Sequence, residues 1–126
     1  MKLYTLERQV EVEAPLAAAF PFFENPANLK LLTPPQLGMR MLTPEPITMQ
    51  HGAVFDYVVA VAGLDTRWTS YIADYDPPHR FVDVQLRGPY SFWHHTHTFE
   101  ERDGGTLCRD LVRYAAPGGP LRPWIE

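Results

Sequence analysis

Two histidines and two aspartates are the residues of this chain whose types and spacing could do chemistry near neutral pH. His95 and His97 alternate within one run, so on a β-strand they share a face while His94 lies on the opposite face. Asp83 and Asp110 lie in the runs before and after it. A carboxylate that faces an apolar interior must be hydrogen-bonded, paired with a cation or neutralised. Pairing with an imidazole is typical of general acid–base sites, so these four residues are candidate catalytic groups.

Other interpretations of these residues stay open. One alternative is that the four groups form a structural network in which every hydrogen-bonding group has a partner. Another is that they lie in water at the mouth of a cavity. The His95-Thr96-His97 spacing is weak evidence for a metal, because a catalytic zinc site needs three protein ligands and the sequence does not place a third. We therefore predict no metal and no cofactor. The single cysteine, Cys108, is predicted to behave as a small hydrophobic residue.

Alternating patterns predict the strands that would position these side chains. Residues 2–13 place Tyr4, Leu6, Val10 and Val12 on one face, which is typical of a half-buried strand. Later runs between turn signals are rich in Val, Tyr, Phe, Trp and Thr, as strands are. The predicted later strands are 53–61, 64–75, 80–87, 90–101 and 106–115, with a short edge strand at 39–42.

Two short helices are predicted between the first strand and the rest of the sheet. Residues 16–23 contain an alanine run with good helix propensity, and Pro15 suits the first helical position. Pro21 should kink or end this helix, because it has no N–H and its ring clashes with the preceding turn. Asn25 then caps a second helix that ends near Leu32. The predicted fold class is α+β, with a curved antiparallel sheet of six to seven strands around a cavity.

Short motifs along most of the chain are similar to those of one known superfamily. They are NLKLLTPP (28–35), GLDTRW (63–68), DPP (76–78), FVDVQ (81–85), GPY (88–90), WHHTHTF (93–99) and GGT (104–106). These segments resemble the SRPBCC superfamily, which includes START-related lipid-binding domains, birch-pollen-allergen-like proteins and polyketide cyclase/dehydrase-type proteins, and in particular its small bacterial members. The resemblance implies a single domain over residues 1–126 with a helix-grip fold, in which the sheet wraps a long C-terminal helix and a hydrophobic ligand lies between the two.

The chain departs from that pattern after its last predicted strand. Pro120 and Pro123 leave too few residues in segment 117–126 for a helix of several turns. The C-terminal helix is therefore predicted to be truncated or missing, which leaves the inner face of the sheet open. Because large exposed apolar faces usually mark interfaces, a homodimer is predicted to cover the opening. A longer natural gene product is the alternative.

The side chains predicted to line the cavity are aromatic, with a few polar residues among them. The family pattern implies that Trp93, His95, His97 and Phe99 point inward. Pockets for small hydrophobic molecules have this composition, although each ring taken singly is more typical of a plain core. The predicted ligand-binding residues are Tyr57, Trp68, Ser70, Phe81, Gln85, Trp93, His95, His97 and Tyr114.

Composition excludes several classes of protein. A chain of 126 residues fits one domain. The net charge of −4 and the absence of a Lys/Arg cluster argue against a nucleic-acid partner. No run approaches the roughly 20 apolar residues of a membrane helix. The charged N-terminus lacks the apolar core of a signal peptide, so a cytoplasmic location is expected.

Three functional hypotheses follow. The leading one is a non-catalytic binder or carrier of a small hydrophobic molecule such as a lipid, isoprenoid, quinone or polyketide-like ring system. The second is an enzyme of the cyclase or dehydratase type, in which His95 or His97, oriented by Asp110 or Asp83, moves a proton. The third is a protein-interaction module whose open groove accepts a partner's helix.

Overall fold

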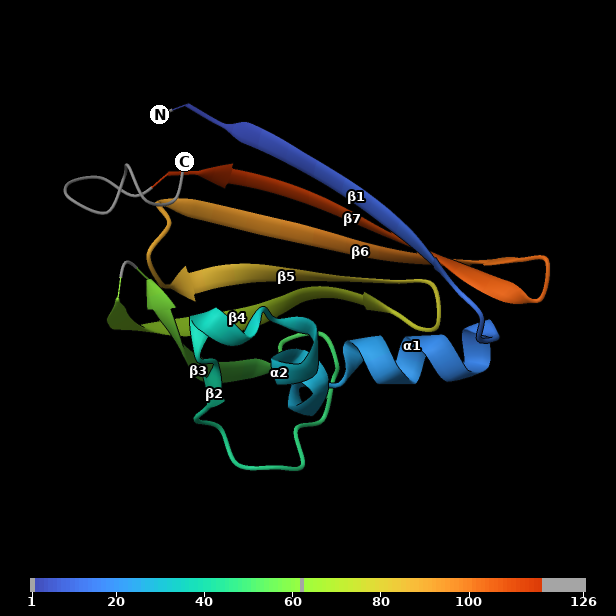
Figure 1. Cartoon of the computed structure of the whole chain (residues 1–126), viewed down its shortest axis with the longest axis horizontal. Coiled ribbons are helices and arrows are strands. Elements are labelled where there is room, and N and C mark those ends of the chain that lie inside the picture. Colours follow the sequence, from blue (N-terminus) through green and yellow to red (C-terminus); the bar gives the residue numbers. More distant parts are fainter. Residues whose placement is uncertain (1, 62, 117–126) are drawn as a thin grey trace.

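The computed structural model describes residues 2–61 and 63–116 of the chain. In this part, one antiparallel sheet of seven strands runs in the order β1-β7-β6-β5-β4-β3-β2 (Figure 1). This confirms the predicted α+β class and the number of strands. The strands are β1 (Tyr4–Val12), β2 (Arg40–Met41), β3 (Val54–Val61), β4 (Leu64–Asp76), β5 (Arg80–Arg87), β6 (Phe92–Arg102) and β7 (Gly105–Ala115).

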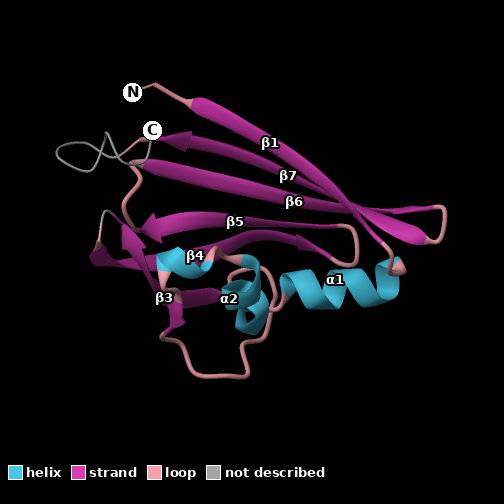
Figure 2. Cartoon of the chain, viewed as in Figure 1, coloured by secondary structure: helices cyan, strands magenta, loops and turns pink. Residues whose placement is uncertain are grey.

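The helices follow β1 and lie together on one side of the sheet (Figure 2). They are α1 (Leu16–Glu24) and α2 (Leu29–Leu32), with 3-10 turns at Pro26–Asn28 (η1) and Pro35–Leu37 (η2). The Asn25 side chain accepts a hydrogen bond of 3.0 Å from the Ala27 N–H, which confirms it as a cap. None of the described helices has the length and apolar character needed to cross a bilayer.

Pro21 does not end α1, which continues to Glu24. The missing backbone hydrogen bond weakens the helix locally. Phe20, one residue earlier, is buried against the sheet, and Phe23 packs against the same core. Helices in proteins draw most of their stability from packing of this kind rather than from propensity, which explains why the helix passes the proline.

A β-bulge sets which residues of β4 face inward. Ile72 pairs with Asp83, but Asp74 pairs with Val82 and Tyr75 with Phe81, so Ala73 is an extra residue. The bulge therefore brings Tyr75 onto the same inner face as Ile72, although simple alternation separates them. We use the term inner face for the side of the sheet against which the helices pack.

The largest apolar cluster lies where α1 packs on the inner face. Phe20 meets Phe99 and Phe81 edge-on, with ring centroids 5.1 and 6.0 Å apart. Fully burying a side chain of this size contributes about 1.5–3 kcal/mol. Cys108 is buried in the same cluster. The cluster consists of Phe20, Phe55, Ile72, Phe81, Phe99 and Cys108.

The first strand corrects one expectation. Leu6 and Val10 are 44% and 52% exposed, so the apolar face of β1 is not covered along the middle of the strand. The strand lies at the sheet edge, paired only with β7, and the described helices pack over other strands (Figure 1). The prediction of a truncated or missing C-terminal helix concerns residues beyond 116, which lie outside the described part.

Candidate functional site

Three neighbouring strands bring the four titratable residues together on the inner face. The β5–β6 register places Asp83 opposite His95, and the β6–β7 register places His97 opposite Asp110. Since opposite residues of antiparallel strands share a face, all four side chains meet. They form what we call the His/Asp quartet: Asp83, His95, His97 and Asp110.

Each histidine of the quartet lies between the two carboxylates. Nε2 of His97 is 2.6 Å from Asp83, and its Nδ1 is 3.3 Å from Asp110. Nε2 of His95 is 2.8 Å from Asp110, and its Nδ1 is 3.8 Å from Asp83. The imidazole rings stack with centroids 3.6 Å apart, and the Phe81 ring lies 4.1 Å from His97 on the other side. Packing and hydrogen bonds therefore hold both rings in one stack.

The carboxylates decide the charge of His97. Burial disfavours the imidazolium, but hydrogen bonds to Asp110 and Asp83 outweigh burial and raise the pKa of His97 to about 9. Burial also raises the pKa of Asp83 and of Asp110, yet the histidines reverse this and hold both below the usual value. Because ionised carboxylates only accept, both ring nitrogens of His97 donate. The quartet thus contains two carboxylates and at least one imidazolium.

A cavity of about 210 Å³ lies beside the quartet. Its wall includes Asp83, His95 and His97, with Trp93 and Trp68 next to them. Trp68 stacks on Tyr57 with an interplanar angle of 14° and meets Trp93 edge-on at 88°. The remaining lining residues are Phe23, Glu24, Asn25, Pro26, Leu29, Met49, Phe55, Tyr57, Ser70, Ile72 and Phe81.

Most of the residues predicted to bind a ligand line this cavity. Seven do so: Tyr57, Trp68, Ser70, Phe81, Trp93, His95 and His97. Gln85 lies outside the lining, and its amide holds the loop before β6 by hydrogen bonds with the N–H and carbonyl of Tyr90. Tyr114 lies further along the inner face, stacked on Tyr4 with ring centroids 5.5 Å apart. Asp110 contacts both histidines but does not line the cavity.

Sequence reasoning missed the contribution of the helices and of β1. Phe23, Pro26 and Leu29 close the cavity from the helical side. Their three-residue spacing, typical of one helical face, was a usable signal. Arg8 pairs with Asp110 in the β1–β7 register, so it shares the face of the quartet. It interrupts the alternation of apolar residues on β1, which is the signal that marks it.

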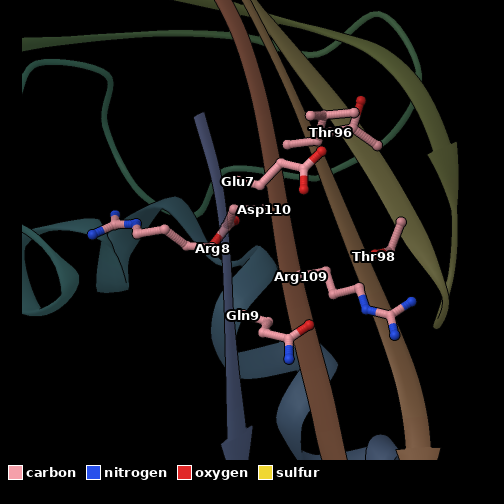
Figure 3. Close-up of a pocket in the computed structure, with 8 residues that line it drawn as sticks. Glu7, Arg8, Gln9, Thr96, Thr98, Arg109 and Asp110 are labelled. Atoms are coloured by element: carbon pink, nitrogen blue, oxygen red, sulfur yellow. The ribbon is translucent and has the colours of Figure 1, made fainter. Parts of the chain in front are cut away.

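A second hollow, of about 590 Å³, lies on the other side of β1, β7 and β6 (Figure 3). Glu7, Gln9 and Arg109 surround it, and Figure 3 shows Arg8 pointing away from Glu7 and Gln9. None of its eight lining residues is aromatic, and Leu111 is the one apolar residue among them. Ligand sites are concave and mostly apolar, with a few convergent polar groups, so the smaller aromatic cavity is the candidate site.

The geometry can be compared with known proteins. The Zhui aromatase/cyclase from Streptomyces sp. R1128 is 20% identical, with a TM-score of 0.74, and the match covers 94% of this chain and 71% of that one. Protein Ms6760 from Mycobacterium smegmatis is 24% identical, with a TM-score of 0.68, over 89% and 73% of the two chains. Major latex-like protein 151 from Panax ginseng is 13% identical, with a TM-score of 0.68, over 94% and 85%. No curated protein matches the chain.

These likenesses show a shared helix-grip-like fold. This is the fold that the resemblance to the SRPBCC superfamily implied. At the level of sequence, the model of one family matches residues 12–124, which is most of the chain and includes the whole quartet. The chain therefore belongs to the family described as polyketide cyclase / dehydrase and lipid transport.

Proposed function

We propose that the chain binds a small hydrophobic molecule that carries an oxygen atom, with the apolar part against the aromatic wall and the oxygen toward the His/Asp quartet. The observation that supports this proposal is the cavity, in which aromatic rings from β3, β4 and β6 surround Asp83, His95 and His97. Lipids, isoprenoids, quinones and polyketide-like rings are ligands of this chemistry. The family description, which names lipid transport and polyketide cyclisation, supports the same classes.

Two hydrogen-bond donors in the wall favour an oxygenated ligand. Tyr57 carries a phenol that is neutral near pH 7 and able to donate, and burial raises its pKa further. Among the buried side-chain nitrogen and oxygen atoms of the described part, Trp68 Nε1 is the one that has no hydrogen-bond partner. An unsatisfied buried donor costs about 1–3 kcal/mol, which a ligand carbonyl or hydroxyl beside Trp68 would offset.

Native mass spectrometry of the chain, purified from its own host without detergent, tests the proposal. We expect a retained small molecule. We also expect quinones and aromatic ketones to quench tryptophan fluorescence, because Trp68 and Trp93 line the cavity. The proposal would be ruled out if the purified protein were empty, no quinone or aromatic ketone quenched its fluorescence, and no lipid of a broad panel bound in native mass spectrometry.

Two variants of β6 localise the binding. Trp93→Ala removes a ring from the cavity wall and should weaken binding about tenfold or more, in line with the loss of one aromatic contact. Phe92→Ala is the matched control, because Phe92 is the preceding residue, has the opposite orientation and is exposed. Equal losses in both variants would mean that the ligand lies elsewhere.

A second candidate function is catalysis of the cyclase or dehydratase type. It is favoured by the 2.8 Å contact between His95 and Asp110, because a carboxylate that orients an imidazole is the usual arrangement of a general acid–base pair. In this mechanism His95 transfers a proton on the bound polyketide-like substrate, while Asp110 holds the ring. His95→Ala and Asp110→Asn should then abolish turnover but retain binding. If no candidate substrate is turned over by the unmodified chain, catalysis is excluded and the carrier function stands.

A further inference from the structure

Donor atoms of three quartet residues lie close together beside the cavity. The Oδ2 atom of Asp83 lies 2.6 Å from Nε2 of His97 and 3.8 Å from Nδ1 of His95. One donor atom from each of these residues lies within 4.8 Å of the others. Atoms that bind the same zinc ion are roughly 3–3.5 Å apart, because each lies about 2.0–2.2 Å from the metal. The spacing is therefore close to that of a three-residue ligand set.

The fourth member of the quartet lies on the far side of both imidazoles. Asp110 is 2.8 Å from Nε2 of His95 and 3.3 Å from Nδ1 of His97, the two nitrogens that do not converge. Histidines that bind metals almost always donate their other N–H to a carboxylate, carbonyl or water. Asp110 accepts these bonds, which leaves a lone pair on Nδ1 of His95 and on Nε2 of His97. Because the two rings stack within 22° of parallel, both lone pairs reach one ion only when the rings turn apart. The proton that otherwise lies between His97 and Asp83 passes to solvent.

The orientation of the set leaves room for a further ligand. Asp83, His95 and His97 all line the cavity, whereas Asp110 does not. Metal sites that act on a bound molecule have three protein ligands and one position open to water or substrate. The charges also match, because two carboxylates with two neutral imidazoles carry two negative charges, which a divalent cation neutralises.

We propose that Asp83, His95 and His97 bind a divalent transition-metal ion, with Asp110 as the carboxylate that orients both histidines. Two imidazoles and one carboxylate suit Zn²⁺ or Fe²⁺ rather than Ca²⁺ or Mg²⁺, which prefer oxygen ligands. The His-x-His spacing on β6 alone did not indicate a metal. The third ligand comes from β5 and the orienting carboxylate from β7, so only the strand order joins them.

The test is a Zn²⁺ titration of the untagged full chain in competition with a chromophoric chelator. Before the titration, metals are removed from the chain with a strong chelator and dialysis. We expect one tight equivalent. Asp83→Asn and His95→Ala remove ligands and should eliminate that equivalent. Asp110→Asn should weaken binding about 10- to 100-fold, as loss of a carboxylate that orients a ligand does. His94→Ala is the matched control, since His94 is adjacent in sequence but on the opposite face of β6, and it should bind as the unmodified chain does.

The absence of a stoichiometric site would overturn the proposal, as would loss of the equivalent in His94→Ala with retention in Asp83→Asn. Folding of each variant is checked by circular dichroism. Co²⁺ binding to the unmodified chain gives a test that needs no variant. We expect strong visible absorption, which is typical of Co²⁺ with few nitrogen and oxygen ligands. Weak absorption like that of hydrated Co²⁺ would overturn the proposal. These readouts do not depend on the organic ligand, so they separate this proposal from the proposed function.

Discussion

The inner face of the sheet has two regions with the same sequence signature and opposite burial. Beneath α1, the alternating apolar residues of β5, β6 and β7 are buried, and Phe81, Phe99 and Cys108 are each exposed by 6% or less. On β1, the equivalent residues Leu6 and Val10 are about half exposed. Periodicity therefore identifies the face of a strand but not whether another element covers it. Coverage depends on where the helices pack.

The covered region explains the location of the candidate site. Phe20 and Phe23 fill the inner face up to Phe81 and Phe99, and the stack of rings continues from Phe81 to His97 and His95. The quartet thus lies at the boundary between the packed core and the open region. This position is dry enough to strengthen its hydrogen bonds and still accessible from the cavity.

The largest effect is expected from removing the ring that joins α1 to the sheet. Phe20→Ala should lower the free energy of unfolding by about 3–5 kcal/mol, because it leaves a cavity among Phe81, Phe99 and Tyr75. Urea denaturation measures the loss. Phe22→Ala is the matched control on the same helix, since Phe22 is 40% exposed, and it should cost less than about 1 kcal/mol. Similar losses in the two variants would show that Phe20 does not hold the helix in place.

The sequence predicted most of the fold because strands and turns depend on local patterns. The bulge at Ala73 was not predictable in this way, since no turn residue marks it and only the pairing with β5 reveals it. It matters to the site: Tyr75 faces inward because of it and contacts α1. The exposure of β1 was not predictable either, because burial of one strand depends on elements far away in the sequence.

The next effect concerns the hydrogen bond that ties the end of α1 to the sheet. Tyr75 donates to Glu24 over 2.7 Å, and burial together with Glu24 raises the pKa of Tyr75 to about 12. The phenol is therefore harder to ionise in the folded state than in the unfolded state, where its pKa is about 10. This contribution is fully present below pH 10 and is lost as the pH rises through 12.

Tyr75→Phe should accordingly cost about 1 kcal/mol below pH 10, and the difference from the unmodified chain should disappear between pH 10 and 12. Urea denaturation at several alkaline pH values measures it. Tyr71→Phe, on the opposite face of β4, controls for loss of a phenol in general and should change stability little. A difference that stays constant up to pH 12 would show that the bond to Glu24 does not control the titration of Tyr75.

The candidate site was partly predictable for a related reason. Alternation on β6 gave the shared face of His95 and His97, and the family pattern gave its inward direction. The contacts of each histidine with both aspartates required the registers of β5 and β7. A one-residue slip of either strand would send its aspartate to the other face, so spacing within β6 could not specify the quartet.

The smallest effect is expected from the open region if water covers it. Val10→Thr keeps the shape and the β-branch of the side chain and adds a hydroxyl where the strand is exposed. If water covers this part of β1, the free energy of unfolding should change by about 0.5 kcal/mol or less in urea. If instead a second copy of the chain covers it, as the exposed apolar face suggests, the hydroxyl is buried without a partner and the cost rises to about 1–3 kcal/mol. In that case the midpoint of unfolding would depend on protein concentration, because dissociation is coupled to unfolding. Light scattering at the same concentrations gives the molar mass of the protein in solution. It therefore decides whether β1 is exposed in a monomer or covered in a dimer.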